Sequence, residues 1–489
     1  MTTPWHYKSA RETRDEVRSG AATALEITEQ HLARIDAVDG KVDAFTQVWR
    51  DEALAQAAAV DDKTRRGEDP GPLAGVQVGL KELLCTKVGK TTCASKMLAN
   101  FQAPYDATVV RKLADAGAVF LGKVNMDEFA MGSSTERSTI KTTKNPWNLK
   151  CVPGGSSGGS AAAVTAGECA ISLGSDTGGS IRQPACLCGC VGIKPTYGRV
   201  SRYGLVAFAS SLDQIGPLTR TVEDAALTLE TICGRDPMDA TSADLPVPEF
   251  TRALTGDIKG LRVGLPEEYF TDALGAEMRE KVEAAVDVFR REGAEIVSVN
   301  LPHTDYAIAT YYIICTAEAS ANLARFDGVR YGFRHPDART VEEMYALSKS
   351  EGFGPEVRRR ILLGTYVLSS GYYDAYYLKA QKVRRLIKKD FDDAFEKCDF
   401  VLGPTSPIPS FEFGAKTDNP LEMYLADIYT ISVNLATLPG ISIPCGLTAS
   451  GLPAGIQMIG RPFAEETLLR AAHCYEQKSG TTLGEPPIA

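Results

Sequence analysis

Residues 153–164 read PGGSSGGSAAAV, and residues 174–184 read GSDTGGSIRQP. Both stretches place small hydroxyl side chains beside glycines, where backbone amides can approach a ligand closely. Each stretch alone could also be a flexible linker, a phosphate cradle or a tight structural turn. The apolar flanking segments disfavour a linker, and neither stretch matches the phosphate-binding glycine patterns. Taken together, the two stretches favour nucleophilic catalysis by a serine.

A serine alcohol is a weak nucleophile until a base removes its proton. No recognisable catalytic setting surrounds any of the chain's histidines, His6, His31, His303, His335 and His473. We therefore expect a lysine base, which must be kept neutral by burial or by nearby cations. Residues 75–80, GVQVGL, predict a buried strand that delivers Lys81 at its end. Taken alone, Lys81 would more often be an ordinary lysine at a strand end.

Strand-like and helical runs alternate outward from these stretches. Thr23 and Glu26 have the spacing of a capping box, which predicts a helical N-terminal part, and residues 61–72 read as a polar linker. Strand-like runs follow at 118–121, 263–265, 295–299, 400–402 and 441–443, with an amphipathic helix at 280–291. This alternation predicts an α/β fold with a largely parallel or mixed sheet covered by helices.

Composition sets broad limits on the class of protein. The chain has 489 residues, 44% hydrophobic and 24% charged, with a net charge of −9, which excludes disordered and fibrous classes. The densest basic run, residues 382–389, predicts the solvated face of an amphipathic helix rather than a nucleic-acid surface. The N-terminus lacks an apolar signal core, no window is apolar enough to span a membrane, and the 12 cysteines form no disulfide-like framework. These features favour a cytoplasmic location.

The chain resembles the amidase signature family. Residues 153–164 and 174–184 match both halves of its characteristic region, and residues 192–200, GIKPTYGRV, extend the match. The separation of Ser156 from Ser180 also fits. The resemblance implies the amidase signature fold, a mixed twisted central sheet covered on both faces by helices. It implies one amidase domain over 1–489, with a mainly helical part at 1–70 and the sheet-containing core at 71–489.

The resemblance also assigns roles by position. Ser180 would be the nucleophile, Ser156 would relay its proton, and Lys81 would be the base. The peptide bond leading into the relay serine is typically cis in this family. The oxyanion hole would be built from backbone N–H groups of residues before and at the nucleophile, namely Thr177, Gly178, Gly179 and Ser180.

A narrower resemblance points to the glutaminase subunits of tRNA-dependent amidotransferases. It rests on residues 125–132 (NMDEFAMG), 201–211 (SRYGLVAFASS), 369–377 (SSGYYDAYY) and 423–430 (MYLADIYT), and extends from about residue 8 to about residue 475. It implies release of ammonia from glutamine or asparagine, for transamidation of misacylated Glu-tRNA(Gln) or Asp-tRNA(Asn).

An amino-acid donor presents a carboxylate and an ammonium group, so its site needs one cation and one anion. By position, Arg360 would hold the carboxylate and Asp427 the ammonium, with Tyr311 lining the pocket. Because Arg358 and Arg359 are adjacent, all three arginines could instead form a solvated helix face.

The resemblance further implies two partners, which are a B subunit with a small C subunit. The B subunit would phosphorylate and amidate the misacylated tRNA, so ATP and Mg²⁺ are expected on that partner, and tRNA contacts mainly there. No ATP-binding motif occurs in this chain, for which we expect no cofactor, no metal and no membrane contact.

Two features depart from the family pattern. Many relatives have Lys-Asp-Asn where this chain has Lys81-Glu82-Leu83, which leaves the local hydrogen bonding to Lys81 open. An alternating run of thiols, Cys186, Cys188 and Cys190, is also unusual. A metal site normally needs four ligands, so buried small side chains are the favoured interpretation.

Two other functions compete with the glutaminase interpretation. A free-standing amidase acting on small aliphatic or aryl amides would share the serines and the lysine. A neutral amide would, however, leave Arg360 and Asp427 without charged partners. A non-catalytic scaffold is disfavoured because Lys81, Ser156 and Ser180 are all retained.

Overall fold

The computed structural model describes residues 4–416 and 420–488. Its strands are β1 (Phe45–Val48), β2 (Gln77–Lys81), β3 (Val119–Val124), β4 (Ile171–Asp176), β5 (Val191–Lys194), β6 (Gln214–Thr219), β7 (Arg262–Pro266), β8 (Glu295–Val299), β9 (Phe400–Pro404), β10 (Gly440–Leu447) and β11 (Pro453–Gly460).

Longer helices connect and cover these strands. They are α1 (Ala10–Ser19), α2 (Ala24–Val42), α3 (Arg50–Arg65), α4 (Thr108–Asp115), α5 (Gly158–Thr165), α6 (Arg182–Cys188), α7 (Val222–Ile232), α8 (Ala276–Arg291), α9 (Ala307–Asn322), α10 (Val341–Gly352), α11 (Pro355–Leu368), α12 (Lys379–Lys397), α13 (Pro420–Tyr424), α14 (Ile431–Leu435) and α15 (Glu465–Lys478). A π-helical turn, η8 (Tyr373–Leu378), precedes α12, and a 3-10 turn, η9 (Leu425–Asp427), follows α13.

In the described part of the chain the strands form one 11-stranded sheet, in the order β1-β3-β2-β4-β6-β5-β10-β11-β9-β7-β8. Parallel pairs lie toward both ends, with β2 between β3 and β4, and β7 between β8 and β9. The central pairs from β4 to β9 are antiparallel. The sheet is therefore mixed, as the sequence predicts.

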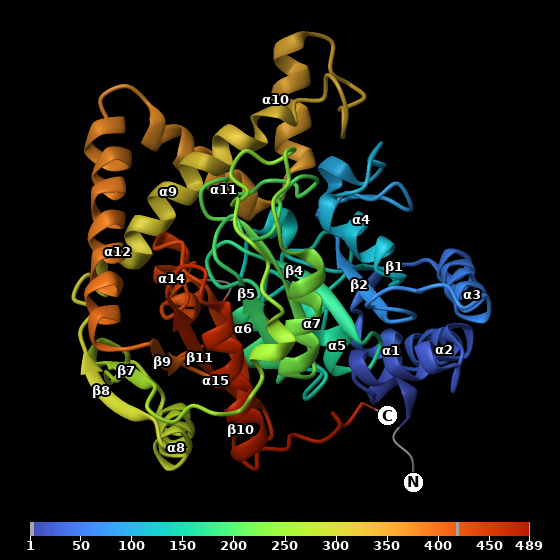
Figure 1. Cartoon of the computed structure of the whole chain (residues 1–489). Coiled ribbons are helices and arrows are strands. Elements are labelled where there is room, and N and C mark those ends of the chain that lie inside the picture. The colour runs from blue at the N-terminus through green and yellow to red at the C-terminus, as the bar shows by residue number, and fades with distance from the viewer. Residues whose placement is uncertain (1–3, 417–419, 489) are drawn as a thin grey trace.

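Helices cover this sheet on both faces. Helix α7 packs against β5 and β6 from the front in the view of Figure 1, while on the other face α5 packs against β6 and α6 packs against β5. Large sets of buried apolar side chains fill the layers between helices and sheet. The predicted α/β architecture is confirmed.

The N-terminal part contributes three helices and one edge strand. Thr23 begins α2 with the predicted capping box to Glu26. The predicted linker at 61–72 is partly wrong, because α3 continues to Arg65. Asp61, on this extra turn, accepts hydrogen bonds from the backbone N–H groups of Ala24 and Leu25 at 2.7 and 3.0 Å, which stabilises the start of α2.

The sheet brings the two glycine-rich stretches to one place. Strand β2 ends at Lys81 and its parallel neighbour β4 ends at Asp176, so both strands deliver their last residues to the same edge. The first glycine-rich stretch leads into α5, and the second links β4 to α6. Residues far apart in sequence therefore meet beside Lys81.

The long helix α12 stands at the side of the molecule and joins α11 through the loop at about residue 370 (Figure 1). Its basic run, residues 382–389, lies within an amphipathic helix, as predicted, with Ile387 buried and Lys389 exposed. Across residues 4–416 and 420–488, we find no helix with the length and apolar character needed to cross a membrane.

Candidate active site

Lys81 is fully buried at the end of β2 and lies among three serines. Its Nζ atom lies 2.8 Å from Ser156 Oγ, 2.7 Å from Ser157 Oγ and 2.9 Å from Ser175 Oγ. Ser157 Oγ donates its own proton to the Ser175 carbonyl oxygen, at 3.2 Å. In this orientation Ser157 accepts a hydrogen bond from Lys81, so the lone pair of a neutral Lys81 amine can be directed to Ser156 or Ser175.

Burial lowers the pKa of Lys81 to about 7. The loss of hydration around the charged amine is the main cause. Three buried carboxylates, Asp127, Asp176 and Asp213, act in the opposite direction and raise this pKa. Near pH 7 a substantial fraction of Lys81 is neutral, as a base requires.

Ser180 is more exposed than the cluster around Lys81. Its exposed fraction is 8%, whereas Lys81 and Ser156 are fully buried. The backbone N–H of Ser157 donates to the Ser180 carbonyl oxygen at 3.1 Å and fastens the two glycine-rich stretches together. The Gly155–Ser156 peptide bond is cis, as the family resemblance implies.

The predicted oxyanion donors occupy the turn after β4. Thr177 Oγ1 donates to Asp213 Oδ1 at 2.7 Å, while the Gly179 N–H donates to Asp176 Oδ1 at 2.8 Å. The amide of Gly179 is thus directed at Asp176 in this structure, and its role toward a substrate oxygen stays a prediction.

Tyr311, on α9, packs directly against this turn. A Cβ atom added to Gly178 would lie 2.7 Å from the Tyr311 Cζ atom, so no larger residue fits at that position without movement of the ring. The structure therefore places Tyr311 beside the loop from Thr177 to Ser180, here named the nucleophile loop after the expected role of Ser180. That Tyr311 lines a donor pocket stays a prediction.

Arg360 is 3% exposed and projects inward from α11. Its Nε atom donates to Glu356 Oε1 at 2.8 Å, one helical turn earlier. The guanidinium also lies over three aromatic rings, those of Phe208, Tyr312 and Tyr424, at 5.2 to 5.7 Å from their centroids. The interpretation of Arg360 as part of a solvated helix face is wrong, because aromatic and acidic groups together make its burial favourable.

Asp427, at the end of η9, is also buried. Its Oδ2 atom accepts a hydrogen bond from Ser133 Oγ, whereas Oδ1 has no hydrogen-bond partner among the described residues. Burial raises the pKa of Asp427 to about 7. A buried carboxylate oxygen without a donor is unfavourable and marks a place where a ligand donor would fit.

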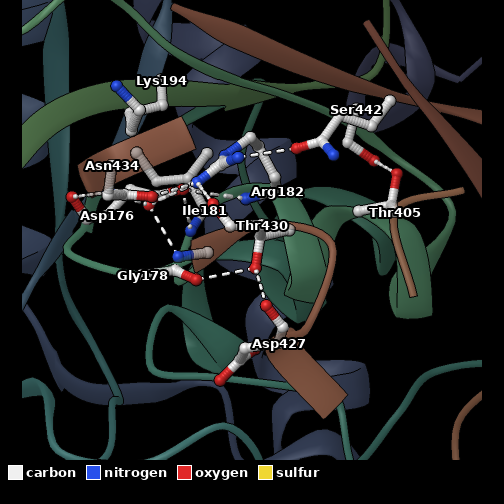
Figure 2. Close-up of polar contacts among 12 residues, drawn as sticks. Asp176, Gly178, Ile181, Arg182, Lys194, Thr405, Asp427, Thr430, Asn434 and Ser442 are labelled. Atoms are coloured by element: carbon white, nitrogen blue, oxygen red, sulfur yellow. Dashed lines mark hydrogen bonds and ion pairs between the residues drawn. The ribbon is translucent and has the colours of Figure 1, made fainter. Parts of the chain in front are cut away.

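A buried network holds the segment after Asp427 against the nucleophile loop (Figure 2). Arg182 donates to both carboxylate oxygens of Asp176 at 3.0 Å and to the Thr430 carbonyl oxygen at 3.1 Å. Asn434 Nδ2 donates to Asp176 Oδ1 at 2.9 Å. Burial alone would raise the pKa of Asp176, but Arg182 outweighs it and holds that pKa below its ordinary value. Asp176 therefore stays ionised as a permanent anchor.

The three alternating thiols are buried in or just after α6. Cys188 Sγ lies 3.2 Å from the Pro153 carbonyl oxygen and Cys186 Sγ lies 3.9 Å from that of Gly455. Burial raises the pKa of Cys190 to about 12, so its thiol is protonated and unreactive. Within the described ranges, no group of three or more His, Cys, Asp or Glu side chains is arranged to hold a metal ion.

Several contributing residues were not anticipated. Glu356 stands four residues before Arg360, a spacing that signals an ion pair on one helix face. Ser157 neighbours Ser156, but no sequence pattern indicates that both lie beside Lys81. Ser133 lies far in sequence from Asp427, and Thr430 far from Gly178. Thr430 ends the stretch 423–430, but nothing in that stretch indicates its contact with Gly178.

The site can be compared with known proteins. A family model described as Amidase matches residues 26–469. The A subunit of the glutamyl-tRNA(Gln) amidotransferase of Carboxydothermus hydrogenoformans is 58% identical over 483 residues, 99% of each chain. That of Geotalea daltonii is 58% identical over 96% of each chain.

Solved structures agree in fold. The A subunit of the Thermotoga maritima glutamyl-tRNA(Gln) amidotransferase is 42% identical, with a TM-score of 0.82 over 99% of both chains. A peptide amidase from Stenotrophomonas maltophilia is 28% identical, with a TM-score of 0.84 over 99% of both chains.

Proposed function

This chain belongs to the amidase family, and on that premise we propose that it is the glutamine-hydrolysing component, the A subunit, of a tRNA-dependent amidotransferase. It releases ammonia from glutamine, or from asparagine, for the transamidation of misacylated Glu-tRNA(Gln) or Asp-tRNA(Asn). The similarity to A subunits at 58% identity along nearly the whole chain supports this function over other amidase activities.

One observation of the site carries the assignment of an amino-acid donor. The buried Asp427 carboxylate has one oxygen, Oδ1, without a hydrogen-bond donor among the described residues. The α-ammonium group of glutamine supplies the missing donor and a compensating charge. A neutral aliphatic or aryl amide supplies neither, so the free-standing amidase is the less favoured alternative.

The hydrolysis proceeds through an acyl-enzyme. Neutral Lys81 accepts the proton of Ser156 as Ser156 accepts the proton of Ser180, and Ser180 Oγ bonds to the carbon of the side-chain amide. The C–N bond then breaks and the proton returns to the leaving nitrogen, which departs as ammonia. Water attacks the acyl-enzyme by the reverse proton path, releases the free acid and restores Ser180.

The donor pocket orients this reaction. Arg360 binds the α-carboxylate, Asp427 binds the α-ammonium, and Tyr311 lines the pocket beside the nucleophile loop. Glu356 and the three rings hold the guanidinium of Arg360 in place before the donor arrives. Backbone N–H groups of the turn from Thr177 to Ser180 that are not held by Asp176 stabilise the tetrahedral oxyanion.

The remaining steps belong to partner subunits. A B subunit carries ATP and Mg²⁺, binds most of the misacylated tRNA and receives the ammonia, and a small C subunit completes the complex. This chain itself carries no cofactor, and the complex acts in the cytoplasm.

An exposed apolar surface supports assembly with a partner. Arg360 faces inward from α11, while the outer face of the same helix exposes Leu362, Leu363 and Tyr366 by 71%, 47% and 48%. Contiguous exposed apolar side chains are typical of sites that another protein covers. A B subunit docked on this face would lie across α11 from Arg360.

The function is tested by purification from the native source. We expect this chain to co-purify with B and C subunits, and the complex to convert glutamine and Glu-tRNA(Gln) or Asp-tRNA(Asn) into the amidated tRNA with ATP. Recovery of a lone chain that hydrolyses many amides but ignores glutamine would favour the free-standing amidase instead.

A further inference from the structure

The peptide unit between Gly178 and Gly179 is held from both sides. Its N–H, on Gly179, donates to Asp176 Oδ1 at 2.8 Å. Its carbonyl oxygen, on Gly178, accepts a hydrogen bond from Thr430 Oγ1 at 2.6 Å (Figure 2). Both polar groups of one peptide plane are therefore engaged by side chains from opposite directions.

These two hydrogen bonds, from Gly179 to Asp176 and from Thr430 to Gly178, form a clamp on the peptide unit. The clamp matters because a glycine lies on each side of this unit. Rotation of the unit changes ψ of Gly178 and φ of Gly179, and neither residue has a Cβ atom that would resist it sterically. Gly179 already has a φ of +137°. The side-chain hydrogen bonds must supply the rigidity that the backbone lacks at this position.

The two sides of the clamp have different origins. Asp176 belongs to the same loop and is kept ionised by Arg182. Thr430 comes from the segment after η9, is fully buried, and also lies 3.0 Å from the Asp427 carbonyl oxygen. One hydroxyl thus contacts both the nucleophile loop and the residue that would bind the donor ammonium.

We infer that Thr430 is a positioning residue, which fixes the Gly178–Gly179 peptide unit for catalysis and links it to the donor-binding segment of Asp427. The inference rests on the proposed glutaminase function. With the clamp in place, the neighbouring amides of the turn keep one orientation toward the reacting amide. Without it, the loop samples rotated states and the oxyanion donors are no longer preorganised.

Thr430 packs tightly on the loop, so its hydrogen bond and its packing must be tested by separate substitutions. A Cβ atom added to Gly179 would lie 2.2 Å from Thr430 Oγ1, so the hydroxyl packs directly on the loop. Thr430→Val keeps the shape and removes the hydrogen bond, whereas Thr430→Ser keeps the hydroxyl and removes a methyl group. These two variants therefore separate the hydrogen bond from packing.

The test measures glutamine hydrolysis by the assembled complex of each variant. We expect Thr430→Val to lower kcat about tenfold to a hundredfold with a change in KM below about threefold, and Thr430→Ser to retain most of kcat. Thermal unfolding of each variant reports the structural contribution separately. If Thr430→Val does not fold, Thr430→Ala takes its place in the comparison with Thr430→Ser.

The outcomes distinguish this inference from the function on which it rests. An unmutated complex that releases no ammonia from glutamine contradicts the proposed function. An active unmutated complex with equal kcat in Thr430→Val contradicts the positioning role alone. Loss of kcat in Thr430→Ser as large as in Thr430→Val would show that packing, not the hydroxyl, is what Thr430 contributes, and would also overturn the inference.

Discussion

The Lys81 Nζ and Ser156 Oγ atoms lie 2.8 Å apart in a region that solvent does not reach. Burial lowers the pKa of Lys81 to about 7, so the amine can accept a proton from Ser156 near neutral pH. The pair can thus work as a base and a relay without a histidine.

The pH dependence of turnover should follow the neutral form of Lys81. We expect kcat for glutamine hydrolysis to rise about tenfold per pH unit below pH 7 and to level off above it, because only the neutral amine is a base. The measurement is kcat from pH 5.5 to 9 at saturating glutamine, where bound donor keeps Asp427 ionised. A kcat that stays constant over this range would contradict Lys81 as the base.

The same pKa predicts an effect on stability. Between the folded pKa of about 7 and the ordinary value of 10.5, the unfolded chain binds more protons at Lys81 than the folded chain. The free energy of unfolding therefore gains about 1.4 kcal/mol per pH unit from this group as pH rises through that window. Lys81→Met should lose this slope. Urea unfolding of both proteins at several pH values measures the difference. An equal pH dependence of the free energy of unfolding in the two proteins would contradict a lowered pKa of Lys81.

The adjacent serines should differ in their effect on catalysis. Ser157 Oγ donates to the Ser175 carbonyl oxygen, so we expect it to be a poorer proton donor to Lys81 than Ser156. We expect Ser156→Ala to lower kcat about a hundredfold or more and Ser157→Ala to have a smaller effect. Ser180→Ala should abolish ammonia release and still assemble. Assays of ammonia release and gel filtration test all three, and unimpaired hydrolysis by Ser180→Ala would exclude it as the nucleophile.

Sequence patterns predicted the parts of this site that are local. The strand ending at Lys81 and the two glycine-rich stretches carry their signal within about ten residues each, and the family resemblance connected them. The contacts of Thr430 with Gly178 and of Ser133 with Asp427 join segments more than 200 residues apart. No periodicity or spacing reports such contacts, because they depend on how the whole sheet and its helices pack.

The burial of Arg360 could also not be predicted from the sequence alone. A run of three arginines is compatible with a solvated helix face. Only the packing of α11 decides that Arg360 points inward to Glu356 and the aromatic rings while Arg358 and Arg359 stay exposed. Helical periodicity could place Glu356 and Arg360 on one face, but not say which face is buried.

The exposed face of α11 should be needed for assembly. A double variant, Leu362→Glu with Tyr366→Glu, places two charges on the outer face and leaves the inward side of the helix unchanged. We expect glutamine hydrolysis by the isolated chain to change less than twofold, and binding to the co-expressed partner subunits to weaken about tenfold or more.

Light scattering after gel filtration measures assembly. Met238→Glu, at a residue 56% exposed elsewhere, is the matched control. Equal assembly of the double variant and the control would contradict a partner surface here.

Donor affinity should depend on the ionisation of Asp427. Its pKa is raised to about 7 by burial, and only the carboxylate attracts the α-ammonium of glutamine. In the Ser180→Ala background, which binds without turnover, Kd for glutamine should fall as pH rises toward 7 and level off above it. Binding at pH 6 should release a proton to the buffer, which calorimetry in two buffers of different ionisation enthalpy detects.

Asp427→Asn removes the charge at nearly constant shape. It should raise Kd about tenfold to a hundredfold at pH 8, in line with the loss of a hydrogen bond to a charged group, and it should abolish the pH dependence. Because Asp427 Oδ2 already accepts from Ser133, the lost affinity reports on Oδ1, which has no partner among the described residues. If the Asn variant binds glutamine as tightly as its parent, the ammonium is held elsewhere, and the assignment of an amino-acid donor loses the observation that carries it.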